Sequence, residues 1–154
     1  MKSFSATTTI NASPETNWEI LTNANGYPDW DPGIDRIEGH IALGEKVKFF
    51  TKLKPSRAFA QRVTTFEPGR KMVFIGGALF GLFKSERTHS LVANADGTTT
   101  YVTRGVFSRS LLPLFGRKIP DLTESFEKSA AGLKELAERG GPPIGSGNTR
   151  PNKR

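Results

Sequence analysis

The chain has 154 residues, of which 36% are hydrophobic and 24% charged, a composition typical of one globular domain. It contains no cysteine, which excludes a disulfide framework, a thiolate metal site and a cysteine nucleophile. Its formal net charge is +7, but no zinc-finger spacing, basic helix or aromatic RNA-binding motif accompanies that charge, so we do not expect nucleic acid binding.

The N-terminal segment predicts a strand followed by one or two short helices. Residues 4–10 alternate between apolar and polar side chains, as in a half-buried strand. Ser13 can cap a helix whose first residue is a proline and whose buried side carries Trp18, Leu21 and Ile20. The prolines and glycines of GYPDWDPG then leave room only for a short helical turn around Trp30. Because no signal peptide or run of roughly 18 apolar residues is found, we expect a cytoplasmic protein.

Between about residues 34 and 108 the sequence predicts about six antiparallel strands. Residues 46–53 alternate lysines with apolar or small residues, so we expect Val47, Phe49, Thr51 and Leu53 to share a buried face. Residues 84–93 and 98–107 flank the turn sequence NADG, a strong hairpin signal. The other candidate strands are residues 34–40, 58–66 and 71–75.

The C-terminal part predicts a long amphipathic helix and a tail. Apolar residues recur at three- and four-residue steps, as on one face of a helix that has Pro120 in its first turn and ends at Gly140. These residues are Ile119, Leu122, Phe126, Ala130, Leu133 and Leu136 or Ala137. Residues 140–154 are rich in Gly, Pro and Asn and carry cations without an acid. We therefore expect a folded domain of residues 1–139 followed by a disordered basic tail.

This order of elements resembles the START/Bet v 1-like (SRPBCC) superfamily, and most of all its polyketide cyclase/dehydrase-like branch. The residues that carry the resemblance are SPETNWEILTN, YPDWDP, FEPGRKMVF and KSERTHSLVANADGTTTYVTRGVFS followed by LLPLFGR. The resemblance covers residues 2–139 and implies an α+β helix-grip fold. In that fold a seven-stranded curved antiparallel sheet wraps around the C-terminal helix, two short helices join the first two strands, and a cavity lies between sheet and helix. Members include lipid and hormone carriers, cyclases and co-chaperones, so the resemblance selects no single activity.

Strand alternation predicts which side chains face that cavity. Arg87 and His89 share one side of their strand, and Tyr101, Thr103 and Phe107 share the matching side of the next. The ligand-binding candidates are Trp30, Phe49, Val63, Phe74, Arg87, His89, Tyr101, Phe107 and Phe126. Arg87 could pair with a ligand carboxylate, and His89 or Tyr101 could exchange a hydrogen bond or, in an enzyme, a proton. Relatives often carry an acid where this sequence has Gly105, which weakens an acid–base mechanism.

Each candidate also has a structural alternative. Arg87 could form an ion pair with Glu86 or Glu67, His89 and Tyr101 could be ordinary core residues, and Trp30 could either close the grip or simply pack. The acids Asp29, Asp31 and Asp35 lie beside Pro and Gly, which is usual for turns, so we expect no metal site and no cofactor.

The leading hypothesis is a protein that binds a hydrophobic or amphipathic small molecule, such as a lipid, polyketide or quinone. The first alternative is a cyclase or dehydratase that holds a polyketide-like chain in the same cavity and uses His89 or Tyr101 for proton transfer. The second alternative is an interaction module that contacts a protein or, transiently, a membrane through the apolar loops 79–83 and 111–115. Whether the chain is an enzyme stays open, although a binding role is favoured, and the sequence assigns no oligomeric state.

Overall fold

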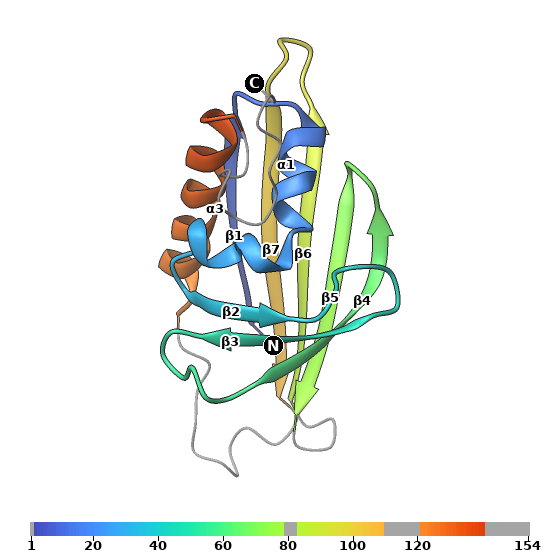
Figure 1. The fold of residues 1–154 in the computed structure, drawn as a ribbon, viewed down its shortest axis with the longest axis vertical. Helices are drawn as coiled ribbons and strands as arrows, with labels where there is room; N and C mark the ends of the chain where they lie inside the picture. The colour runs from blue at the N-terminus through green and yellow to red at the C-terminus, as the bar shows by residue number, and fades with distance from the viewer. Residues whose placement is uncertain (1, 79–82, 110–120, 141–154) are drawn as a thin grey trace.

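The computed structural model describes residues 2–78, 83–109 and 121–140. In these residues seven strands form one antiparallel sheet in the order β1-β7-β6-β5-β4-β3-β2 (Figure 1). The strands are β1 (Lys2–Ile10), β2 (Ile34–Glu38), β3 (Lys46–Thr51), β4 (Phe59–Glu67), β5 (Lys71–Ala78), β6 (Phe83–Ala93) and β7 (Thr99–Arg109). The helices are α1 (Pro14–Leu21), the 3-10 helix η1 (Ala24–Asp29) and α3 (Thr123–Glu138). The predicted α+β helix-grip architecture is confirmed.

The sheet is strongly curled. The pairing register shifts between Ile34 and Arg36 in β2 and between Val63 and Thr65 in β4, and such bulges bend a strand and increase its twist. As a result β2 and β3 run across the direction of the long strands (Figure 1). Helix α3 packs on β1 and β7 near one edge of the sheet, and η1 packs on β2 at the other edge. The helices therefore pack on the concave face near its two edges.

Helix α1 begins as its sequence predicts, and of the three residues expected to be buried, Ile20 and Leu21 are buried. The Ser13 hydroxyl accepts a hydrogen bond from the Thr16 N–H at 3.1 Å, which satisfies one free donor of the first turn. Leu21 is fully buried as expected. Trp18, however, is only partly buried and packs its ring on Phe66, with the centroids 5.2 Å apart. In place of Trp18, the polar residue Asn17 is fully buried, and its amide donates to the Ser13 carbonyl at 2.9 Å.

Helix α3 begins at Thr123, later than the predicted start around Pro120. The physical reason is local. The Asp121 carboxylate accepts a hydrogen bond from the Thr123 N–H at 2.9 Å, and this bond satisfies the backbone donor of the first helical residue. The predicted apolar face of the described helix is buried, and it comprises Phe126, Ala130, Leu133, Leu136 and Ala137. Gly140 follows the helix with φ at 105°, a left-handed conformation that suits glycine at a helix end.

The C-terminal half of α3 is tied to β1 by hydrogen bonds. Lys134 Nζ donates to the Thr9 carbonyl at 2.6 Å, and Glu138 Oε2 accepts from the Asn11 N–H at 2.8 Å. The same two side chains form an ion pair at 2.7 Å. These bonds fix the end of α3 against the end of β1.

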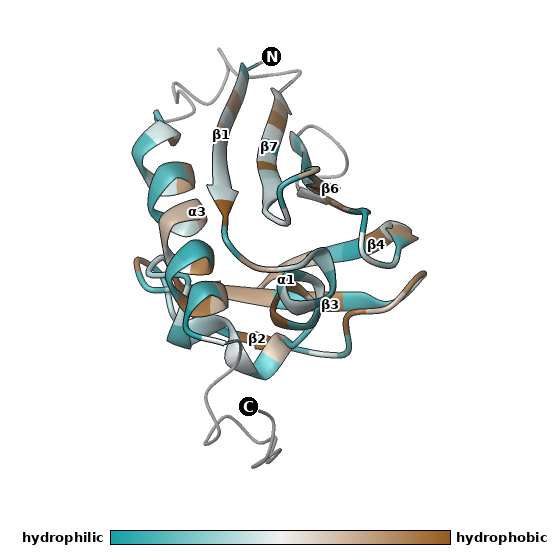
Figure 2. Cartoon of the chain, turned by 90° about the horizontal axis from the view of Figure 1, so that it is seen from above, coloured by the Kyte–Doolittle hydropathy of each residue, from teal (hydrophilic) through white to brown (hydrophobic). Residues whose placement is uncertain are grey.

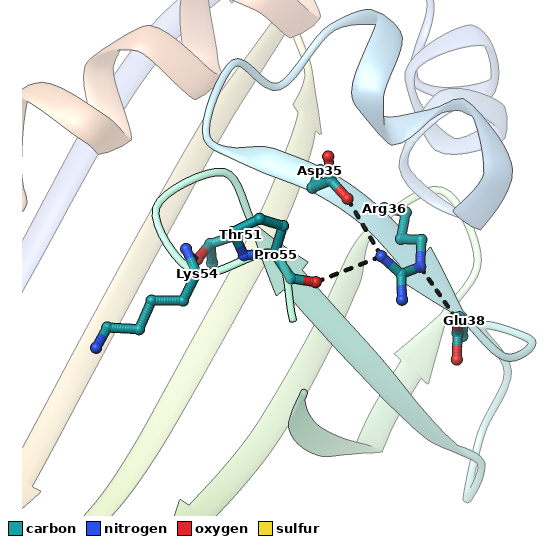
Figure 3. Close-up of polar contacts among 6 residues, drawn as sticks. All are labelled: Asp35, Arg36, Glu38, Thr51, Lys54 and Pro55. Atoms are coloured by element: carbon teal, nitrogen blue, oxygen red, sulfur yellow. Dashed lines mark hydrogen bonds and ion pairs between the residues drawn. The ribbon is translucent and has the colours of Figure 1, made fainter. Parts of the chain in front are cut away.

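The predicted alternation in residues 46–53 is only partly correct. Val47 is buried as expected, but β3 ends at Thr51, and Leu53 lies in the following turn with 93% of its surface exposed. Phe50, on the opposite face, is only 7% exposed because the Arg36 guanidinium covers its ring at 3.8 Å. Figure 3 shows how Arg36 is held there, by Asp35 at 3.2 Å, by Glu38 at 3.0 Å and by the Pro55 carbonyl at 3.4 Å.

Several predicted segments lie outside the described residues. They are residues 79–82 of the first apolar loop, all of the second apolar loop (111–115), and residues 141–154 of the predicted tail. Among the described helices, none is both long enough and apolar enough to cross a membrane.

Candidate functional site

The inner faces of β6 and β7 lie side by side in the predicted orientation. Arg87 is opposite Gly105, His89 is opposite Thr103, and Leu91 is opposite Tyr101. Apolar residues of α3 lie on the side of the helix that faces the sheet (Figure 2). The space between them is where the family resemblance places a ligand cavity.

His89 and Tyr101 form a hydrogen-bonded pair in the core. The His89 Nδ1 atom lies 2.7 Å from the Tyr101 hydroxyl oxygen, and the two side chains are 5% and 0% exposed. Burial lowers the pKa of His89 well below its usual 6.5, and the charge of Arg87 lowers it further. Burial also raises the pKa of Tyr101 to about 12. Both groups are therefore neutral near pH 7, which suits a hydrogen bond better than proton transfer.

Arg87 is half-buried and its side chain is held in place from two directions. Its Nε–H donates to the Thr103 hydroxyl at 2.7 Å, and its guanidinium carbon lies 4.0 Å from the centre of the Phe126 ring. No ion pair among the described residues includes Arg87. Glu67 pairs with Arg70 at 3.7 Å instead, and Glu86 is exposed on the outer face. The predicted structural ion pair with either glutamate is therefore wrong.

Gly105 allows the helix to approach the sheet closely. A Cβ atom at Gly105 would lie 2.7 Å from Phe126 Cζ and 3.0 Å from Phe107 Cε1. Phe4 completes this group, with its ring 6.0 Å from Phe107 and 6.2 Å from Phe126. We call Phe4, Phe107 and Phe126 the aromatic cluster. An acidic side chain at residue 105 would have to displace this cluster.

Trp30 lies in the core, where it joins the η1–β2 loop to α3. Its ring packs on Tyr27 with centroids 4.7 Å apart, and a Cβ at Gly132 of α3 would overlap its carbonyl oxygen. The next residue, Asp31, accepts hydrogen bonds from the Ser129 hydroxyl at 2.9 Å and the Gly33 N–H at 3.1 Å. Within the described part of the chain, Trp30 Nε1 is buried without a hydrogen-bond partner.

The remaining candidates line the sheet side of the same region. Phe74 is buried and meets Phe49 edge-on at 5.4 Å and His89 edge-on at 5.9 Å. Val63 is fully buried, and it pairs with Phe74 across β4 and β5. Phe49, Arg87 and Phe107 are instead partly exposed. The predicted residues thus divide into a buried group and a group that solvent can reach.

Sheet topology places two members of the reachable group toward one end of the grip. Because all neighbouring strands are antiparallel, the C-terminal ends of β5 and β7 and the N-terminal end of β6 share that end. Phe107 lies next to it in β7, and Arg87 lies four residues into β6, at a depth of roughly 14 Å. His89 and Tyr101 lie deeper.

Sequence reasoning missed several contributions to the site. Thr103 was expected to face inward, but its role as the Arg87 acceptor depends on the strand register. Tyr27, in η1, was not singled out; its hydroxyl donates to the Leu21 carbonyl at 2.7 Å, and burial raises its pKa.

Two other features are separate from this site. A surface groove of about 350 Å³ lies between β1 and α3, and none of the predicted ligand-binding residues lines it. Among the described residues, no three potential metal ligands come together, and Asp31 and Asp35 have the separate partners already given.

Known structures share the fold. A START superfamily protein from Mycobacterium smegmatis is 18% identical with a TM-score of 0.68, over 89% of this chain and 97% of that chain. Protein MLL2253 from Mesorhizobium loti is 16% identical with a TM-score of 0.69, over 90% and 98% of the two chains. The Aha1 dimer from Colwellia psychrerythraea gives 19% identity and a TM-score of 0.63, over 91% and 98%. At these identities the likeness shows the fold alone.

No curated protein matches the sequence significantly. The family model described as "Polyketide cyclase / dehydrase and lipid transport" matches residues 1–138, which include every described strand and helix. The chain, which has a START-like helix-grip fold, therefore belongs to the polyketide cyclase/dehydrase and lipid transport family.

Proposed function

We propose that this protein binds a hydrophobic or amphipathic small molecule, such as a lipid, polyketide or quinone, between the sheet and α3. The observation that carries the proposal is the partial exposure of Phe49, Phe107 and Arg87 on the concave face of the sheet. Aromatic rings left open to water in a concave surface are a typical lining for an apolar ligand. The family and the fold support the same role.

The deeper candidates require movement before a ligand can reach them. Val63, Phe74 and Tyr101 are at most 1% exposed, so a ligand that contacts them must displace protein atoms. The described bonds that fix α3 lie mainly in its central and C-terminal parts, at Ser129, Lys134 and Glu138. We propose that the N-terminal turns of α3, which carry Phe126, move to admit the ligand.

The site favours binding over catalysis. The cyclase or dehydratase alternative needs a group that exchanges protons near neutral pH. His89 has a lowered pKa and Tyr101 a raised one, so each keeps its neutral form in that range. No observation favours the enzyme over the carrier, and the apolar loops of the interaction-module alternative lie largely outside the described residues.

Native mass spectrometry and lipid extraction of protein purified gently from its own host test the proposal. We expect a bound apolar molecule, and we expect Phe107→Ser to lose it. Val106→Ser is the matched control, because Val106 is the neighbouring residue and faces the other side of the sheet. Protein that carries no ligand under gentle conditions, and that also fails to bind a neutral apolar dye such as Nile red, would contradict the proposal.

A further inference from the structure

We propose that the ligand carries an anionic head group, either a carboxylate or a phosphate, and that the Arg87 guanidinium binds it. This inference rests on the proposed function, because it assumes that a ligand enters the grip. It adds the chemical class of the ligand and its orientation, with the charged end at Arg87 and the apolar end among the aromatic rings.

The first argument is the way in which Arg87 is held. Thr103, which accepts from Nε, is fully buried, and the Phe126 ring lies flat enough against the guanidinium to bring its centre within 4.0 Å. These contacts fix the position and the plane of the guanidinium but use only its Nε–H. No hydrogen bond to the two terminal amino groups is formed by the described residues. A guanidinium fixed in this way can offer paired N–H donors to two oxygens of one anion.

The second argument is charge balance. Asp31 is the only buried carboxylate among the described residues, and its Oδ1 is engaged by Ser129 and Gly33 rather than by a cation. Glu86, the neighbour of Arg87 in sequence, is exposed on the outer face of the sheet. The positive charge of Arg87 therefore lies on the inner face of the sheet without an acid paired to it. This charge contributes to the lowered pKa of His89. An anion bound at Arg87 would supply the missing partner.

The third argument is the surrounding surface. The aromatic cluster of Phe4, Phe107 and Phe126 lies directly beside Arg87, because Phe126 contacts both the guanidinium and Gly105. A cation next to a group of aromatic rings matches a molecule with a charged end and an apolar body.

The test compares ligands that differ only in the head group. Nile red, which is neutral, first reports whether the apolar site exists independently of any charge. Dodecanoate, dodecyl phosphate and dodecanol then compete with Nile red below their micelle-forming concentrations, and the hexadecyl series repeats the comparison for a longer chain. We expect the anions to compete at concentrations about 10- to 100-fold lower than the alcohol, as a charge-assisted hydrogen bond implies. The stronger of the two anions identifies the head group.

Variants then assign the effect to Arg87. Arg87→Met should bring the acid and the alcohol to similar affinities. Arg87→Lys should keep part of the preference for the anions, because lysine retains the charge but not the paired N–H donors of the guanidinium. Arg104→Met is the matched control, because it removes the same charge from an exposed position on the outer face of β7. Nile red binding and circular dichroism show that each variant is folded.

The outcomes separate this inference from the proposed function. If Nile red binds but the acid and the alcohol compete equally in the unmodified protein, the anionic head group is wrong and the apolar site stands. If the preference for the acid survives in Arg87→Met, the assignment to Arg87 is wrong. If neither Nile red nor any competitor binds, the proposed function fails and this inference fails with it.

Discussion

Replacing Gly132 of α3 by alanine tests the contact that holds the η1–β2 loop against the helix. In an ordinary helix this change is favourable by about 1 kcal/mol, because alanine has the higher helix propensity. Here the added Cβ would overlap the Trp30 carbonyl oxygen and lie 3.0 Å from the Trp30 carbonyl carbon. Both obstructing atoms belong to the backbone, so no side-chain rotation can relieve the overlap.

The expected magnitude follows from what must move. To accept the methyl group, the loop has to withdraw from α3. Trp30 then loses packing contacts, and the Asp31–Ser129 hydrogen bond is broken. Complete loss of a buried large aromatic side chain costs about 3–5 kcal/mol; the loss here is partial, about 2–4 kcal/mol, and the broken hydrogen bond adds about 1 kcal/mol. After the gain in helix propensity, we expect a net destabilisation of about 2–4 kcal/mol. For a domain of this size, that lowers the melting temperature by roughly 4–16 °C.

Thermal and urea unfolding followed by circular dichroism measure this change. The matched control is Ala131→Gly, the reverse exchange at the adjacent exposed position, which should cost only about 1 kcal/mol through helix propensity. The reasoning is refuted if Gly132→Ala is as stable as the unmodified protein or more stable. In that case the approach of Trp30 to the helix would not limit the size of residue 132.

Three further predictions concern the inner face of the sheet. Gly105→Ala should cost about 1–3 kcal/mol in urea unfolding by overpacking against Phe126, and combining it with Phe126→Leu should recover part of that loss; a fully additive pair would contradict the contact. Tyr101→Phe should cost about 1–3 kcal/mol, because it leaves His89 Nδ1 buried without its partner; an unchanged unfolding midpoint would argue against the hydrogen bond. Because the pKa of His89 is lower in the folded state than in the unfolded state, its contribution to stability is present above pH 6.5 and is lost as the pH falls below that value, by at most about 1.4 kcal/mol per pH unit. Unfolding measured between about pH 7 and pH 5 should therefore show a smaller loss in His89→Gln, and equal slopes for the two proteins would disprove the buried neutral histidine.

Much of the fold follows from local patterns. The Ser13 cap, the NADG turn and the alternation along β6 each depend on residues that are close in sequence, so the elements they predict are present in the structure. The inward orientation of Arg87 and His89 follows from the same alternation. These predictions required no knowledge of which strands are neighbours.

The errors arise where a distant residue decides burial. Alternation placed Leu53 inside and Phe50 on the wet face, but β3 stops at Thr51, and Arg36 of the neighbouring strand covers the Phe50 ring. The buried Asn17 is a similar case, because its position depends on how α1 lies on the sheet.

The inward orientation of the candidate residues was predictable, but their contacts were not. Strand alternation identifies the residues that face inward, but it cannot show that Thr103 accepts from Arg87, since that bond depends on the register between β6 and β7. Likewise, nothing near Gly132 in sequence indicates that the Trp30 backbone lies against it. Both contacts join segments whose relative placement is set only by tertiary packing.

Strands β1 and β2 follow one another in the chain but form the two outermost strands of the sheet. Residues 11–33, which contain α1 and η1, therefore cross from one margin of the curled sheet to the other and form a tether between these margins (Figure 1). The length of this tether limits how far the margins can separate. Insertions in this tether would widen the enclosed space and deletions would narrow it, while every strand keeps its sequence. Such changes would be a simple way to accommodate ligands of different width.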